Sequence, residues 1–191
     1  LTGALGGVLR GTPTAIAPGD RDGLYQAIHN VRRLLDSGPQ PPRTFVPLTE
    51  VSAADLATAA ANPDGIATRY ALKELNPFAL LGANYGRFNA AGELDLYDPA
   101  TGRGALSTDW IADRAGLLAA VLARNVADRT DPLIDGDTAY KDLALGLALG
   151  PNSLPQVAVI FGSAAGESMA FTHTRGDRVH LYGMAGNDSL L

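Results

Sequence analysis

The residues best suited to chemistry are the last ones of the chain. It ends on LYGMAGNDSLL, where Gly183, Gly186, Asp188 and Leu190 fill the first, fourth, sixth and eighth positions of the nonapeptide G-G-x-G-x-D-x-U-x, with U a large apolar residue. Met184 replaces the second glycine. Glycines permit a tight turn with inward carbonyl oxygens, and the Asp carboxylate is a hard oxygen ligand of the kind Ca²⁺ prefers. The sequence therefore predicts a Ca²⁺ site with ligands from Gly183, Ala185, Asn187 and Asp188.

Two weaker copies of this turn precede it. In residues 162–169, Gly162 takes the first position and Glu167 the acidic one, while Asp177 is the acidic residue of the stretch between the two copies. These acidic positions are 10 and 11 residues apart, against the nine of the repeat. Stacked turns share ions, so one copy alone should bind Ca²⁺ poorly. We expect Gly162, Glu167 and Asp177 to be secondary ligands.

Signatures of nucleophilic catalysis are weak. An α/β-hydrolase needs G-x-S-x-G on a strand-to-helix turn. In FGSAAG the motif's second glycine stands three residues after Ser163 in place of two, and no helix pattern follows. This pattern is typical of a turn. His173 and His180 are candidates for a triad histidine that completes a Ser and an Asp elsewhere in the sequence. His180 also lies between two apolar residues, as an outward-facing strand residue would.

Two groups of acidic residues could have a chemical role, but a purely structural role explains each group as well. The acidic residues of LIDGDTAYKD lack the spacing of an EF-hand, which leaves an irregular Ca²⁺ site or a solvated loop. Glu93, Asp95 and Asp98 could supply the acid pair of a glycosidase. Glu93 and Asp95 alternate with leucines, however, and a half-buried strand explains that pattern without chemistry.

The composition excludes several classes of partner and site. The net charge is −5 and no basic stripe is present, so nucleic acid is not an expected partner. The absence of cysteine excludes disulfides, a Cys-ligated zinc and a Cys nucleophile, and fits either a cytosolic protein or export in a single step. No apolar run approaches the ~20 residues of a membrane span. The chain starts on Leu1 without a signal peptide, so we expect it to be a piece of a longer one.

The elements that must position these residues change character along the chain. We predict an α+β fold: a linker over 1–19, a mainly helical domain over 20–155, and over 156–191 a strand followed by the start of a calcium β-roll. Apolar spacing predicts helices, and alternation or β-branched runs predict strands. The predicted helices cover 20–36, 52–61, 66–75, 108–126 and 140–149, and the predicted strands lie within 93–97 and at 156–161.

The final stretch, VIFGSAAGES followed by DRVHLYGMAGNDSLL, resembles the entry into the calcium-binding repeats of RTX (repeats-in-toxin) proteins. The segments RYALKELNPFALLGANY, GELDLYDPATGRGALSTDWIADRAGLLAAVLARN and YKDLALG resemble the region between the catalytic part and the repeats of bacterial RTX lipases or hydrolases. The resemblance implies Ca²⁺ as cofactor and secretion from a Gram-negative bacterium by a type I apparatus. It also implies contact with an upstream catalytic domain.

Three functions remain open from the sequence. The favoured one is a non-catalytic segment of an RTX protein that leads into the repeats and is attached to an upstream lipase or hydrolase. The second is part of the catalytic unit of a lipase- or esterase-like toxin or effector, contributing a lid or a triad histidine. The third is a protein-binding module.

Overall fold

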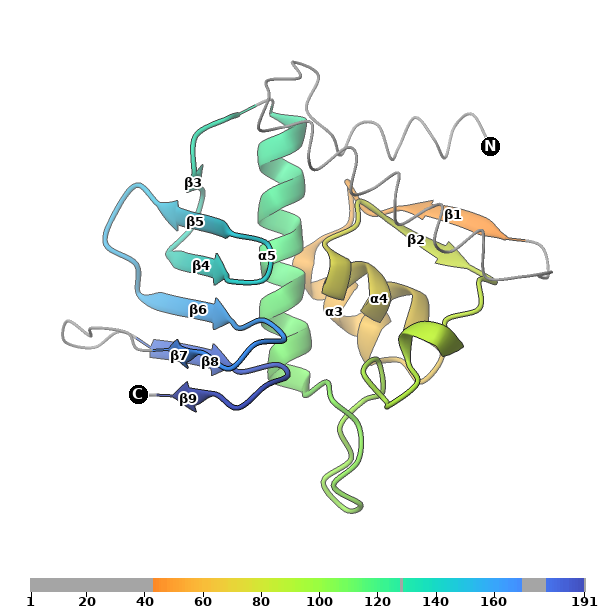
Figure 1. Cartoon of the computed structure of the whole chain (residues 1–191). Coiled ribbons are helices and arrows are strands. Elements are labelled where there is room, and N and C mark those ends of the chain that lie inside the picture. The colour runs from red at the N-terminus through yellow and green to blue at the C-terminus, as the bar shows by residue number, and fades with distance from the viewer. Residues whose placement is uncertain (1–42, 128, 170–177, 191) are drawn as a thin grey trace. The chain divides into compact units, whose positions relative to one another are not determined.

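The structure, a computed structural model, describes residues 43–127, 129–169 and 178–190. The described residues contain both α-helices and β-strands, as predicted (Figure 1). The chain divides into two compact units, Leu1–Thr130 and Asp131–Leu191. The predicted linker over 1–19 and helix over 20–36 lie outside the described residues. No helix in the described part combines the length and the apolar character needed to cross a membrane.

Within residues 43–127, the described part of the first unit, three helices pack with a small sheet. Helix α3 packs against α4 and α5, α4 also packs against strand β2, and β1 pairs with β2 in antiparallel register. The helices and β2 supply the core, with Leu56, Tyr70, Phe78 and Leu118 among the largest fully buried side chains. The elements are β1 (Thr44–Pro47), α3 (Ala53–Ala61), α4 (Ile66–Glu74), β2 (Phe78–Leu81), the 3-10 turn η1 (Gly86–Phe88) and α5 (Thr108–Val126).

The predicted helices over 52–61, 66–75 and 108–126 are confirmed, and local caps explain their bounds. Ser52 caps α3 by accepting a 3.1 Å hydrogen bond from the Asp55 amide. Ser107 does the same for α5 through the Trp110 amide, also at 3.1 Å. Such caps satisfy an amide that has no partner inside the helix. Helix α4 ends at Glu74, and the next residue, Leu75, stops it with a φ of 50° in the left-handed region.

Two buried arginines hold the three helices together by binding the carbonyl ends of α3 and α4. Arg69 on α4 donates to the carbonyl oxygens of Ala60 at 2.8 Å and Asn62 at 2.7 Å, at the end of α3. Arg114 on α5 donates to those of Leu72 at 2.8 Å and Lys73 at 2.7 Å, in the last turn of α4. The last carbonyls of a helix have no partner inside it and carry partial negative charge, so a guanidinium satisfies them well.

The predicted strand within residues 93–97 is wrong. Residues 89–95 form turns in which the Asn89 side chain accepts from the Leu94 amide at 2.7 Å and donates to the Asp95 carboxylate at 2.8 Å. Only isolated bridges follow, between Leu96 and Leu106 and between Asp98 and Arg103. Leu94 is buried and Arg69 binds its carbonyl oxygen at 2.6 Å, so tertiary contacts override the alternating pattern.

The second unit is a β structure. Five strands pair in the order β3-β5-β4-β6-β8, and β7 pairs with β9 in a separate two-stranded sheet (Figure 1). The predicted strand at 156–161 is confirmed as β6. The strands are β3 (Leu133–Ile134), β4 (Thr138–Asp142), β5 (Leu147–Pro151), β6 (Val157–Phe161), β7 (Ser168–Met169), β8 (Arg178–Tyr182) and β9 (Ser189–Leu190).

The predicted helix over 140–149 is wrong, because this segment forms the antiparallel pair β4 and β5. Asp142 accepts a 2.9 Å hydrogen bond from the Leu145 amide, and Gly146 has a φ of 61°, so the chain reverses between the two strands. β4 also pairs in parallel with β6. The apolar run LALGLAL suits either a short helix or a strand, and pairing with β6 decides between them.

Candidate metal centre

The candidate Ca²⁺ ligands lie in two turns of the second unit, which lie one above the other. Turn A (162–167) connects β6 to β7, and turn B (183–188) connects β8 to β9. Val157 pairs with Arg178, and Ser168 pairs with Ser189, so both parallel pairs have an offset of 21 residues. The same offset places Gly162 at Gly183 and Glu167 at Asp188 in the stack. Figure 1 shows both turns at the same end of the strands.

Backbone hydrogen bonds join the two turns along their length. The Gly162 amide donates to the Tyr182 carbonyl at 2.7 Å, just before turn B. The Ala185 amide donates to the Ser163 carbonyl at 3.3 Å, and the Ser189 amide donates to the Glu167 carbonyl at 2.8 Å. The turns are therefore in register from their first residue to their last.

Glycines allow the turns to approach this closely. A Cβ on Gly162 would lie 2.6 Å from the Gly183 carbonyl oxygen, and a Cβ on Gly186 would lie 2.5 Å from that of Ala165. Both distances are shorter than real Cβ contacts. The sequence predicts these glycines from turn geometry, and the structure adds a second requirement, which is contact between neighbouring turns.

The two acidic residues of the frame meet in the stack. The Glu167 amide donates to Oδ1 of Asp188 at 2.9 Å, and both residues are half-buried. The Glu167 carboxylate accepts from the Ser163 amide, at 3.1 Å to each oxygen, and from the Ser163 hydroxyl. The Ser163 oxygen in turn accepts from the Ala165 amide at 3.0 Å. Ser163 is therefore a turn residue, as its sequence context predicts.

Met184 occupies the position at which the repeat has its second glycine, and its backbone reflects this. Its φ is 67°, in the left-handed region that costs an L-residue about 1–2 kcal/mol. Turn B thus keeps the backbone conformation that a glycine would favour, although a methionine stands there. The turn therefore has the backbone geometry of the repeat at this position, although its residue type departs from the repeat.

The donor set of the stack fits Ca²⁺. It offers the carboxylates of Glu167 and Asp188 together with backbone carbonyl oxygens, which are the hard oxygen ligands of that ion. The Gly183 carbonyl oxygen and Glu167 Oε2 lie 2.6 and 3.1 Å from the position of a Cβ on Gly162, so oxygen atoms surround that glycine. Backbone carbonyl oxygens would have to supply much of the coordination shell of an ion bound here. Within 43–127, 129–169 and 178–190, no group of three His, Cys, Asp or Glu side chains could hold a metal ion.

Of the remaining predicted ligands, two lie in turn B and one lies outside the described residues. Ala185 and Asn187 lie exposed in turn B, and a Cβ on Gly166 of turn A would lie 2.9 Å from the Asn187 carbonyl oxygen. Both residues therefore belong to the stacked pair with Gly183 and Asp188. Asp177 lies outside the described residues.

Of the two histidine candidates for catalysis, the described one, His180, lies outside turns A and B. His180 lies in β8, half-buried, and pairs with Val159 of β6. His173 lies outside the described residues. The strand position of His180 agrees with its alternation with apolar neighbours in the sequence.

The other carboxylates act as hydrogen-bond acceptors within turns. Glu93 accepts from the Ala91 amide at 2.8 Å, and hydrogen bonds from its own amide and that of Ala91 lower its pKa. The Thr101 hydroxyl and then the Ala100 amide lower the pKa of Asp98. Asp142 is buried and caps the turn before β5. A general acid at neutral pH needs a raised pKa, so the pKa shifts of Glu93 and Asp98 run against that role.

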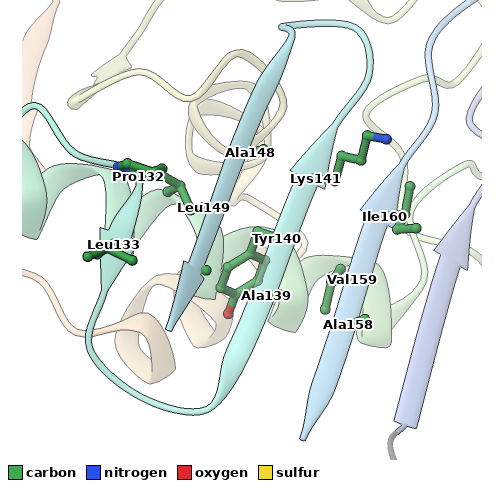
Figure 2. Close-up of a pocket in the computed structure, with 11 residues that line it drawn as sticks. Pro132, Leu133, Ala139, Tyr140, Lys141, Ala148, Leu149, Ala158, Val159 and Ile160 are labelled. Atoms are coloured by element: carbon green, nitrogen blue, oxygen red, sulfur yellow. The ribbon is translucent and has the colours of Figure 1, made fainter. Parts of the chain in front are cut away.

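An apolar groove that no sequence pattern predicted lies on the sheet of the second unit. Figure 2 shows this groove, of about 440 Å³, over β3, β5, β4 and β6. Tyr140 and Lys141 bring the only polar side-chain groups among its lining residues. Strand pairing brings small residues such as Ala139 and Ala158 side by side, and no local sequence pattern signals that pairing. The lining residues are Pro132, Leu133, Ala139, Tyr140, Lys141, Ala148, Leu149, Gly150, Ala158, Val159 and Ile160.

The chain was compared with protein-family models, curated proteins and solved structures. No family model, no curated protein and no solved structure matches it. What can be inferred about its function therefore comes from its own residues and their geometry.

Proposed function

We propose that this chain is a non-catalytic, calcium-binding segment of a secreted RTX protein, and that turns A and B are the first turns of a calcium β-roll. The observation that carries the proposal is the shared 21-residue offset of the two parallel strand pairs. That offset aligns the glycine, acidic and apolar positions of two copies of the repeat frame. Register of this kind between successive copies is what a stacked repeat needs.

Asp188 is the principal Ca²⁺ ligand in this proposal, together with the backbone carbonyls of Gly183, Ala185 and Asn187. Gly162 and Glu167 of turn A contribute from the neighbouring turn. The ion supplies positive charge between two half-buried carboxylates and holds inward carbonyl oxygens, so its chemistry is structural. A ligand that binds only the folded chain stabilises it by about 2.7 kcal/mol at one hundred times its Kd.

Coupling of Ca²⁺ binding to folding would suit a protein exported by a type I apparatus. Turns that depend on the ion stay loose without it and become ordered after export, when they bind it. The resemblance to RTX lipases and hydrolases supports a catalytic part outside these 191 residues, because the chain has no G-x-S-x-G.

The test is thermal unfolding of the 191-residue chain in EDTA, in Ca²⁺ and in Mg²⁺, with calorimetric titration of each ion. We expect Ca²⁺ to raise the Tm and to give a binding signal. Mg²⁺ should do neither, because it demands a smaller octahedral shell and sheds water reluctantly. Identical melting curves in all three solutions, with no heat of binding, would remove calcium from the proposal.

A further inference from the structure

Turns A and B differ in how they use their acidic residue. In turn A, the Glu167 carboxylate folds back on its own turn and accepts from the Ser163 amide and hydroxyl, four residues earlier. In turn B, Asp188 Oδ1 accepts from the Glu167 amide of the neighbouring turn. The acidic position of the repeat therefore has two uses. Glu167 closes turn A on itself, and Asp188 joins turn B to turn A.

The side-chain length explains this difference. Glutamate has one methylene more than the aspartate of the repeat, and both of its oxygens lie 3.1 Å from the Ser163 amide nitrogen. Inward backbone amides form a concave site that a negative charge stabilises. Bonds to a carboxylate are also stronger than those between neutral groups. Turn A thus has a resident anion that holds its first residues in place.

We propose that Glu167 makes turn A independent of calcium, so that turn A is a preformed template on which turn B is assembled. Turn B docks on this template through the Glu167 residue itself: its amide donates to Asp188, and its carbonyl accepts from the Ser189 amide at 2.8 Å. Glu167 is thereby a positioning residue for Asp188. The calcium response of turn B rests on the function proposed above, whereas the closure of turn A does not.

The experiment measures amide hydrogen exchange of Ser163, residue by residue, in EDTA and in Ca²⁺. The 191-residue chain is compared with its Glu167→Gln, Glu167→Asp and Asp188→Asn variants. The Leu143 amide, which donates to the Phe161 carbonyl at 2.9 Å, reports whether β4 and β6 stay paired in each variant. A variant in which Leu143 also loses protection is replaced by Ser163→Ala, which removes the hydroxyl alone.

In EDTA, the wild-type Ser163 amide should be protected, and Glu167→Gln and Glu167→Asp should each speed its exchange by about tenfold or more. Glu167→Asp should regain protection in Ca²⁺, because it restores the residue of the repeat. Asp188→Asn should leave Ser163 protected in EDTA. Unchanged exchange at Ser163 in EDTA in both Glu167 variants overturns the proposal.

The outcomes separate this inference from the function it accompanies. If Ca²⁺ has no effect on the wild type while the Glu167 variants expose Ser163 in EDTA, calcium binding fails and the closure of turn A stands. If Ca²⁺ stabilises the wild type and the Glu167 variants lose protection only in its presence, the Glu167 carboxylate acts solely as a calcium ligand and does not close turn A, and the preformed template is refuted.

Discussion

The backbone amide of Glu167 donates a 2.9 Å hydrogen bond to Oδ1 of Asp188, a residue 21 positions further along the chain. This contact joins the acidic residues of two turns that the sequence analysis treats as separate copies of one motif. It makes Asp188 a side-chain link between the turns, and Asp188 is also the principal ligand of the proposed calcium site. Changes at either residue should therefore be measurable in stability as well as in ion binding.

Asp188→Asn should abolish the response of the Tm to Ca²⁺. The amide keeps one oxygen for the Glu167 hydrogen bond but removes the charge that a divalent cation needs. Calorimetric titration and thermal melts in EDTA and Ca²⁺ measure the effect. Asp64→Asn is the matched control, since Asp64 is exposed in the turn between α3 and α4 and belongs to no candidate calcium site. An equal loss in both variants would mean that the response is only bulk charge.

Gly162→Ala should lower the free energy of unfolding of the second unit by about 1–3 kcal/mol, as overpacking does. The new Cβ would lie 2.6 Å from the Gly183 carbonyl oxygen, which is backbone and cannot move aside cheaply. Chemical denaturation followed by circular dichroism measures the change. Gly150→Ala is the control, because no atom lies within 4 Å of a Cβ there. If both variants are equally stable, the turns are not in close contact.

Met184→Gly should raise the free energy of unfolding by about 0.5–1 kcal/mol. Glycine relieves the cost of a φ of 67°, and the greater freedom of the unfolded chain offsets part of that gain. Met184→Ala separates backbone from side chain, because alanine keeps the strained conformation and should bring no stabilisation. Denaturant titrations of the three chains measure the difference. Equal stabilisation by alanine and glycine would assign the effect to the lost side chain.

Arg114→Met should destabilise the helical unit by about 2–4 kcal/mol. The substitution keeps much of the apolar stem but leaves the carbonyl oxygens of Leu72 and Lys73 without the guanidinium that they accept from. Arg103→Met is the control, because that residue is exposed. Thermal melts monitored at the helical signal compare the variants. A melt of the Arg114 variant equal to that of the control would show that solvent replaces the lost bonds.

Asp98 should titrate below its ordinary pKa of 3.8, because the Thr101 hydroxyl and the Ala100 amide stabilise its charged form. A carboxylate whose pKa is lower in the folded state stabilises that state above its unfolded pKa. Its contribution is lost as the pH falls through the lower folded value. NMR titration of Asp98 in the wild type and in Thr101→Val measures the shift. The variant should move the pKa upward, and an unchanged pKa would exclude the hydroxyl as its main cause.

The helices were predictable because their signals are local. Apolar spacing and the serines at 52 and 107 place α3 and α5 within a residue of their observed bounds. The β-branched run of β6 is equally local. The segments 93–97 and 140–149 were wrongly predicted, since Asn89 and Arg69 in one case and pairing with β6 in the other decide their structure.

The sequence by itself determined the residue types of the candidate site: glycines, oxygen ligands and an apolar position in a repeat frame. In the sequence, spacing can be counted only between consecutive acidic residues, which are 10 and 11 positions apart. Tertiary structure decided that the residues in contact are Glu167 and Asp188, with an offset of 21. The physical reason is that β6 pairs in parallel with β8, and β7 with β9. The turns that follow β6 and β8 therefore meet, although a whole connection separates them in the sequence. Which turns meet is therefore a property of strand pairing, which no local pattern contains.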